Sequence, residues 1–144
     1  MLARSVSTAG YPGTPLHRKL GIEEGSRVLV VGAPDGYPGA LGLPPGVELL
    51  RRAAKELDVV LLFVVRRAEL ARRFPRLART LAPAGGLWVA WPKKSSGVAT
   101  DVDFAEVQRI GLASGLVDNK VAAIDETWSG LRFVIRLKDR PDKR

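Results

Sequence analysis

The chain has no cysteine and a single histidine, His17, among its 144 residues. The missing cysteines exclude disulfide scaffolds, thiolate zinc sites and cysteine nucleophiles, and they favour a cytoplasmic protein. Any Ser-His-Asp triad would have to use His17, and no serine lies in a nucleophile elbow. We therefore expect neither cysteine-dependent nor triad-dependent hydrolase chemistry.

Long apolar runs are also missing. The longest one, residues 59–65, has the length of a strand, whereas crossing a bilayer takes about 20 residues. Residues 1–13 contain no apolar stretch of the kind that a secretory signal requires. We therefore expect neither a membrane span nor membrane association.

Aromatic residues are few, at 6%, although the formal net charge is +8. Much of the positive excess lies in one predicted helix, which holds Arg66, Arg67, Arg72, Arg73, Arg76 and Arg79. Aromatic side chains do not interleave with these arginines, and no zinc-finger, helix-turn-helix or RNP pattern is present. We interpret the arginines as a solvated face without specificity for nucleic acid, so any DNA or RNA binding should weaken steeply with salt.

The overall composition is that of a globular domain. Apolar residues form 46% of the chain and charged residues 26%. Residues 1–13 are small, polar and glycine-rich, which predicts a loose N-terminal arm. Residues 14–144 are predicted to form one domain, because the length leaves no room for a second.

Apolar, β-branched runs predict strands at residues 27–32, 58–65 and 87–91. Residues 59–65 are apolar without alternation, which is typical of a parallel strand covered on both faces. Residues 47–50 predict a short strand, with the opening of a helix as the alternative. Residues 120–124 and 131–137 predict two final strands, and the short turn 125–130 makes the last one antiparallel at one side. The predicted core side chains are Leu29, Val31, Val60, Leu62, Val64, Leu77, Val89 and Val107.

Three helices alternate with these strands. Thr14 and Pro15 are typical of a helix start, and Gly21 ends that short helix. Apolar residues between 70 and 81 recur at helical spacing, but Pro75 should kink or split the helix, and residues 82–86 should break the chain. A capping-box pattern at residues 103–106 starts a helix that ends near 115. The order predicts an α/β, Rossmann-like three-layer sandwich with a mainly parallel sheet.

Ligands of open α/β sheets bind beyond the carboxyl ends of the strands. After the strand at 87–91 come two lysines and two hydroxyls that suit an anion, Lys93, Lys94, Ser95 and Ser96, although they lack the spacing of a Walker loop. We predict that Asp125, Glu126 and Trp128 form the opposite wall, where the carboxylates orient the lysines or a ligand hydroxyl. Asp35 and Tyr37 complete the rim.

These residues leave two functions open. No nucleophile–base pair or metal set can be assembled from them, which favours a ligand-binding or interaction module with an anion-binding cleft. The alternative is an enzyme that acts on a small anionic substrate at the same cleft. No cofactor is predicted from the residue types.

The order of motifs resembles a class I S-adenosylmethionine-dependent methyltransferase. The similar stretches are residues 27–32, 58–62 and 81–89, and they imply the fold of that family. The chain departs from its cofactor motifs: Val30 stands at the acidic position, Pro34 at the middle glycine, and Leu50 and Arg51 where an acidic residue grips the ribose. We therefore expect that S-adenosylmethionine does not bind usefully. The resemblance adds a divergent S-adenosylmethionine-dependent methyltransferase to the alternative functions.

A second resemblance covers nearly the whole chain. Residues 10–16 (GYPGTPL), 87–94 (LWVAWPKK), 116–120 (LVDNK) and 125–133 (DETWSGLRF) resemble a family of small bacterial proteins that is known only as a domain of unknown function. This resemblance implies no established activity.

Overall fold

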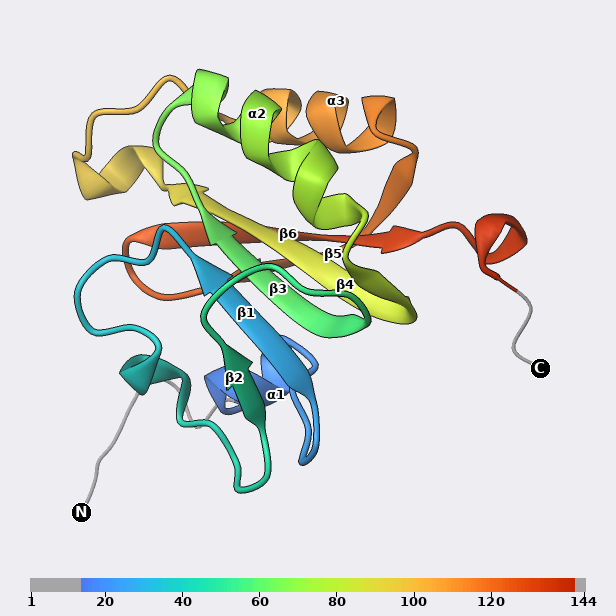
Figure 1. Cartoon of the computed structure of the whole chain (residues 1–144). Coiled ribbons are helices and arrows are strands. Elements are labelled where there is room, and N and C mark those ends of the chain that lie inside the picture. The colour runs from blue at the N-terminus through green and yellow to red at the C-terminus, as the bar shows by residue number, and fades with distance from the viewer. Residues whose placement is uncertain (1–13, 142–144) are drawn as a thin grey trace, which may run out of the picture.

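The computed structural model describes residues 14–141, so the predicted arm at 1–13 lies outside the described residues. A six-stranded sheet with the order β2-β1-β3-β4-β6-β5 forms its centre (Figure 1). The strands are β1 (Arg27–Val31), β2 (Glu48–Leu50), β3 (Leu57–Phe63), β4 (Leu81–Pro92), β5 (Leu116–Ala123) and β6 (Trp128–Ile135). The first four are parallel, whereas β6 is antiparallel to both β4 and β5. The α/β prediction is confirmed, but the last strand lies inside the sheet and β5 forms the edge.

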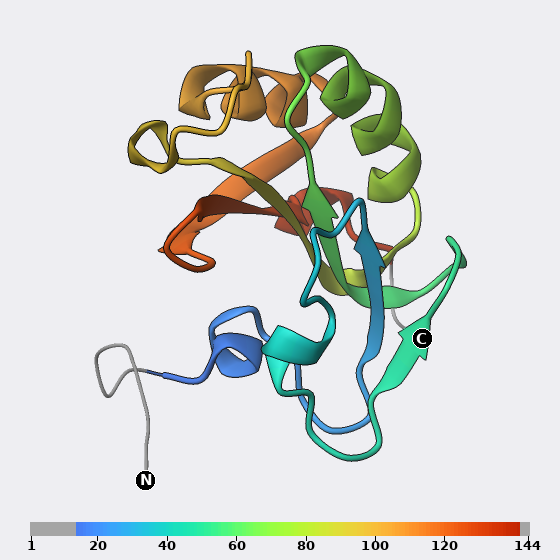
Figure 2. The same cartoon turned by 90° about the vertical axis from the view of Figure 1, so that its left-hand side faces the viewer.

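Helices cover both faces of this sheet. The helices α2 (Arg67–Ala78) and α3 (Phe104–Ala113) pack against each other on one face (Figure 1). The short helix α1 (Leu16–Lys19) and the 3-10 turn η2 (Gly39–Leu41) lie on the other face (Figure 2). Two further 3-10 turns are η3 (Lys94–Ser96) and η4 (Leu137–Asp139). Within residues 14–141, none of the helices has the length and apolar content that a membrane crossing requires.

The apolar run of β3 is explained by its two covered faces. Val60 and Leu62 belong to the core layer beneath α2 and α3, which also contains Phe74 and Val107. Alternate side chains, including Leu61, belong to the layer beneath α1 and η2. As predicted, β3 and β4 are adjacent and parallel. The predicted core residues are buried except for Val31, which is half-buried.

Two local features differ in part from the predictions. Helix α2 is continuous through Pro75, because burial of Leu70, Phe74 and Leu77 along one side offsets the missing hydrogen bond. Residues 82–86 belong to β4, which begins at Leu81, but the pairing with β3 is irregular there, since Leu57 pairs with Leu81 and Val59 with Gly86. Gly85 is needed in this strand for a close approach, because a Cβ there would lie 2.5 Å from the Leu57 carbonyl oxygen.

Candidate functional site

The sheet has a topological switch point between β1 and β3. The chain leaves β1 toward β2 on one side and leaves β3 toward β4 on the other, so a crevice is expected at these two carboxyl ends. Gly32 ends β1 there with φ +72°. A Cβ at Gly32 would lie 2.7 Å from the Phe63 carbonyl oxygen and 3.2 Å from Arg73 Nη1, so only glycine fits this close approach.

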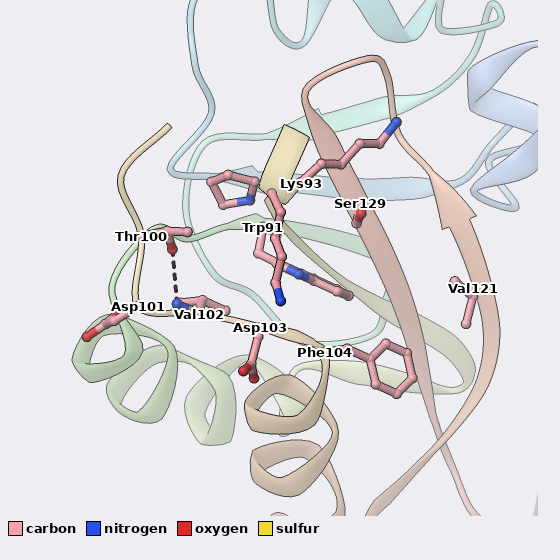
Figure 3. Close-up of a pocket in the computed structure, with 11 residues that line it drawn as sticks. Trp91, Lys93, Thr100, Asp101, Val102, Asp103, Phe104, Val121 and Ser129 are labelled. Carbon is pink, nitrogen blue, oxygen red and sulfur yellow. Dashed lines mark hydrogen bonds between the residues drawn. The ribbon is translucent and has the colours of Figure 1, made fainter. Parts of the chain in front are cut away.

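A pocket of about 530 Å³ opens beside this edge, at the end of β4, and we call it the Trp91 pocket. It is lined by Trp91, Pro92, Lys93, Lys94, Thr100, Asp101, Val102, Asp103, Phe104, Val121 and Ser129. Figure 3 shows Trp91 between the segment 100–102 on one side and Ser129 and Val121 on the other, with Phe104 below it. Trp91 and Phe104 meet edge to face with ring centroids 6.2 Å apart, which gives the pocket an aromatic floor.

Backbone contacts fix the acidic side of the pocket. Asp101 Oδ1 accepts a hydrogen bond of 2.6 Å from the Arg67 amide, which begins α2. Asp103 Oδ1 accepts one of 2.9 Å from the Glu106 amide, so Asp103 caps α3 as the sequence indicated. The second oxygen of each carboxylate has no recorded donor among residues 14–141. With two lysines and two carboxylates around aromatic rings, the pocket suits a ligand that carries both signs of charge.

The lysines predicted to bind an anion lie in this pocket, but the neighbouring serines do not line it. The Ser96 hydroxyl donates to the Lys93 carbonyl oxygen at 2.7 Å and accepts from the Val98 amide at 3.1 Å. Ser95 is exposed on the same turn. The Ser96 hydroxyl therefore stabilises η3, and the assignment of both serines to an anion stays a prediction.

The predicted opposite wall forms a separate group on the face of α1. The Tyr37 hydroxyl donates to Asp125 Oδ2 at 2.7 Å, and Asp125 Oδ1 accepts from the amides of Thr127 and Trp128. The rings of Tyr37 and Trp128 each lie 5.0 Å from the Phe63 ring. Tyr37, Asp125 and Trp128 thus form a clasp between two loops. Asp35 and Glu126 are exposed beside it.

Sequence reasoning missed several residues of the Trp91 pocket. Asp103 was interpreted only as a helix cap, Trp91 as the end of a strand, and Asp101 and Phe104 received no role. Their shared position after β4 was the available signal, because loops at the carboxyl ends of parallel strands converge. Asp125 does not line this pocket, although the Lys93 amide donates to the Thr127 carbonyl oxygen at 2.8 Å.

The clasp predicts a pH dependence of stability. Burial and the hydrogen bond to Asp125 raise the pKa of Tyr37 above its ordinary value of 10.0. The folded state therefore holds this proton more tightly, so the stabilisation is complete below pH 10.0 and decreases as the pH rises further. Between about pH 9 and 11, the melting temperature of the wild type should fall more steeply than that of Tyr37→Phe.

Calorimetric scans of both proteins check this expectation, and the effect should be small because Tyr37 is only half-buried. Absorbance titration of the phenolate gives a second readout. Asp125→Asn should move the titration of Tyr37 back toward its ordinary range, because it removes the charged acceptor. Parallel melting curves for the wild type and Tyr37→Phe would contradict the role of the clasp.

Comparisons with known proteins support the fold. No protein-family model and no curated protein matches the sequence. Among solved structures, the chain is similar to magnesium protoporphyrin IX methyltransferase from Synechocystis PCC 6803 with bound SAH, at 13% identity and a TM-score of 0.57 over 78% of this chain and 74% of that one. A SAM-dependent methyltransferase from Aquifex aeolicus is 18% identical, with a TM-score of 0.57 over 81% of this chain and 85% of that one. Fibrillarin from Aeropyrum pernix, with natively bound S-adenosyl-L-methionine, is 14% identical, with a TM-score of 0.57 over 87% of this chain and 70% of that one. The described residues therefore have the Rossmann-like methyltransferase fold.

From the departures in the cofactor motifs we expected that S-adenosylmethionine does not bind usefully, and this expectation is wrong. Structures of this fold that are only 10 to 14% identical to the chain hold S-adenosylmethionine or SAH, so departures from the sequence motifs do not exclude this cofactor. Gly32 leaves the turn without a side chain where β1 ends close to the Phe63 carbonyl oxygen, although Pro34 follows. The resemblance to a bacterial family of unknown function is matched by no family model and stays a prediction.

Proposed function

We propose that the chain is a divergent S-adenosylmethionine-dependent methyltransferase that takes an anionic acceptor in the Trp91 pocket. The observation that carries the proposal is the match of 78 to 87% of the chain to structures that hold this cofactor or SAH. Of the hypotheses from the sequence, this alternative has more support than a module that only binds a ligand.

The residues at the switch point fit such a cofactor. Gly32 lets the backbone turn without a side chain, and no acceptor among residues 14–141 is recorded for the amides of Ala33, Asp35 and Gly36. These amides would meet the carboxylate of the cofactor, and the exposed Asp35 side chain would meet its amino group or ribose. When bound, S-adenosylmethionine supplies a methyl group on a sulfonium for transfer to a nucleophilic acceptor atom.

The acceptor site adjoins this edge through the end of β3. The Thr100 hydroxyl donates to the Val65 carbonyl oxygen at 2.6 Å, and the Asp101 amide donates to the same oxygen at 3.3 Å. These bonds hold one wall of the Trp91 pocket against the strand that borders the switch point. In the pocket, the rings of Trp91 and Phe104 exclude water from a flat acceptor, and the lysines bind its anionic group.

The free oxygen of Asp103 is the group that can orient the acceptor. One carboxylate oxygen of Asp103 accepts a hydrogen bond from the Glu106 amide in α3, which fixes the direction of the carboxylate. The second carboxylate oxygen can accept a hydrogen bond from a hydroxyl of the methyl acceptor. This bond would turn the hydroxyl oxygen of the methyl acceptor toward the switch point. Phenols and hydroxy acids combine such a hydroxyl with the planar or anionic parts that the pocket suits.

Titration calorimetry with S-adenosylmethionine and SAH tests the cofactor site. We expect saturable binding of both to the wild type. Ala33→Glu should weaken it at least tenfold, because a carboxylate would then stand beside the amides that receive the carboxylate of the cofactor. Ala40→Glu is the matched control, since it adds the same charge at an exposed position of η2 and should bind as the wild type does.

Methyl transfer from labelled S-adenosylmethionine to a panel of phenolic and carboxylic acceptors tests the second half of the proposal. Trp91→Ala should lower the transfer while the affinity for SAH stays within twofold. A folded wild type that gives no heat with either compound at millimolar concentration would refute the proposal. Cofactor binding without transfer to any acceptor would favour a ligand-binding module.

A further inference from the structure

A separate cavity, of about 410 Å³, lies at the amino ends of the parallel strands. We call it the Arg132 cavity. Its lining comes from the turn before β1, the starts of β3 and β4, and β6, and consists of Gly21, Glu23, Glu24, Gly25, Ser26, Asp58, Ala84 and Arg132. The switch point and the Trp91 pocket lie at the carboxyl ends of the strands, so this cavity belongs to neither of them.

The position of Arg132 depends on a glycine in the neighbouring strand. Arg132 of β6 is paired with Trp88 of β4, and its guanidinium lies over Gly86 of the same strand. A Cβ at Gly86 would overlap Arg132 Nε and would lie 2.7 Å from Arg132 Nη2. Any side chain at Gly86 would therefore push the guanidinium away from this part of the cavity wall.

The charge of Arg132 is poorly compensated. Arg132 Nη1 donates to Asn119 Oδ1 at 3.3 Å, and among residues 14–141 no ion pair is recorded for this guanidinium. Burial and the positive charge of Arg140 lower the pKa of Arg132. A carboxylate bound to Arg132 would offset both effects, because it favours the charged guanidinium.

The other wall of the cavity is acidic and held by backbone contacts. Glu23 and Glu24 lie on a turn that is closed by two hydrogen bonds, from the Glu23 amide to Ser26 Oγ at 2.9 Å and from the Ser26 amide to the Glu23 carbonyl oxygen at 3.0 Å. Asp58 Oδ2 accepts a hydrogen bond of 2.8 Å from the Arg27 amide. In the described part of the chain, these three carboxylates have no recorded ion pair either.

Charges of both signs thus line one cavity without neutralising each other across it. A ligand that fits between them needs an anionic group for the guanidinium and cationic groups for the carboxylates. Three carboxylates face one guanidinium, so a ligand with more positive than negative groups matches the walls best. The volume is in the range of small-ligand pockets.

From this arrangement we propose that the Arg132 cavity binds a free α-amino acid with a cationic side chain, such as lysine or arginine. The guanidinium of Arg132 binds the α-carboxylate, since a planar guanidinium and a carboxylate form paired hydrogen bonds. The α-ammonium and the side-chain cation bind the carboxylates of Glu23, Glu24 and Asp58. This site goes beyond the proposed methyltransferase function and does not depend on it.

Titration calorimetry with L-lysine and L-arginine, in physiological salt, tests the ligand class. We expect saturable binding of both amino acids to the wild type. Lysine amide, which lacks the carboxylate, and Nε-acetyl-lysine, which lacks the side-chain charge, should each bind at least tenfold more weakly than lysine. No heat from lysine or arginine at millimolar concentration would overturn the proposal, and so would equal affinities for lysine and lysine amide.

The double variant Glu23→Gln, Glu24→Gln tests the acidic wall and should weaken lysine binding at least tenfold. The matched control is Glu48→Gln, Glu56→Gln, which removes the same charge at exposed positions outside the cavity and should bind within twofold of the wild type. Equal weakening in both double variants would indicate a general charge effect and would overturn the proposal.

Competition separates this site from the proposed function. Protein saturated with S-adenosylmethionine should still bind lysine, and lysine should bind even if the cofactor does not. Displacement of lysine by S-adenosylmethionine would overturn the proposal. Loss of lysine binding in Trp91→Ala would overturn it as well, because it would place the amino acid in the Trp91 pocket.

Discussion

Replacement of Trp88 by alanine should destabilise the protein by about 3–5 kcal/mol, as is typical when a fully buried aromatic side chain is lost. Trp88 is fully buried in the layer beneath α1, in contact with a cluster that includes Phe63 and Ile124. Its indole Nε1 donates to the Leu20 carbonyl oxygen at 3.0 Å. The substitution therefore leaves a cavity and also an unsatisfied carbonyl at the end of α1. A domain stabilised by about 5–15 kcal/mol would lose a large share of its stability.

Urea unfolding followed by circular dichroism measures this loss. Trp88→Phe is the matched variant, because it retains an aromatic ring but removes the donor to Leu20. We expect it to cost about 1–3 kcal/mol, the penalty for a buried acceptor without its partner. A cost below about 1 kcal/mol for Trp88→Ala would contradict the role of this side chain as the centre of the layer.

The sheet could be predicted from sequence because its strands carry strong local signals. Residues 59–65 are apolar on both faces, and only a central strand covered by two layers satisfies that pattern. Misleading signals came from residues whose usual role was overridden by packing. Pro75 stays inside α2 because the helix buries a large apolar stripe, and Gly85 lies in β4 because the neighbouring backbone comes too close for a side chain.

The candidate site was harder to predict because it depends on contacts that are distant in sequence. Lys93 and Lys94 line the Trp91 pocket together with Asp101 and Asp103, whereas Asp125 does not line it. The carboxylate of Asp125 is engaged by the Tyr37 hydroxyl, a contact that joins residues 88 positions apart.

The packing of α3 against the sheet is the basis of the second large stability effect. Gly111 of α3 lies against Phe133 of β6, and a Cβ at Gly111 would overlap the edge of that ring. Phe133 is fully buried and packs edge to face on Phe74 of α2, with centroids 5.1 Å apart, so the ring has no free space to move into. The same helix begins at Asp103 and Phe104, which line the Trp91 pocket.

We therefore expect Gly111→Ala to destabilise the protein by about 1–3 kcal/mol through overpacking. Alanine favours a helix interior by about 1 kcal/mol over glycine, so a net loss of stability isolates the steric term. Phe133→Leu makes room at the same contact, and the double variant should cost at least about 1 kcal/mol less than the sum of the two single variants. Additive costs in urea unfolding would show that α3 does not depend on this contact. The expected coupling would instead show that one glycine sets the distance of α3 from the sheet, and with it the position of Phe104 in the Trp91 pocket.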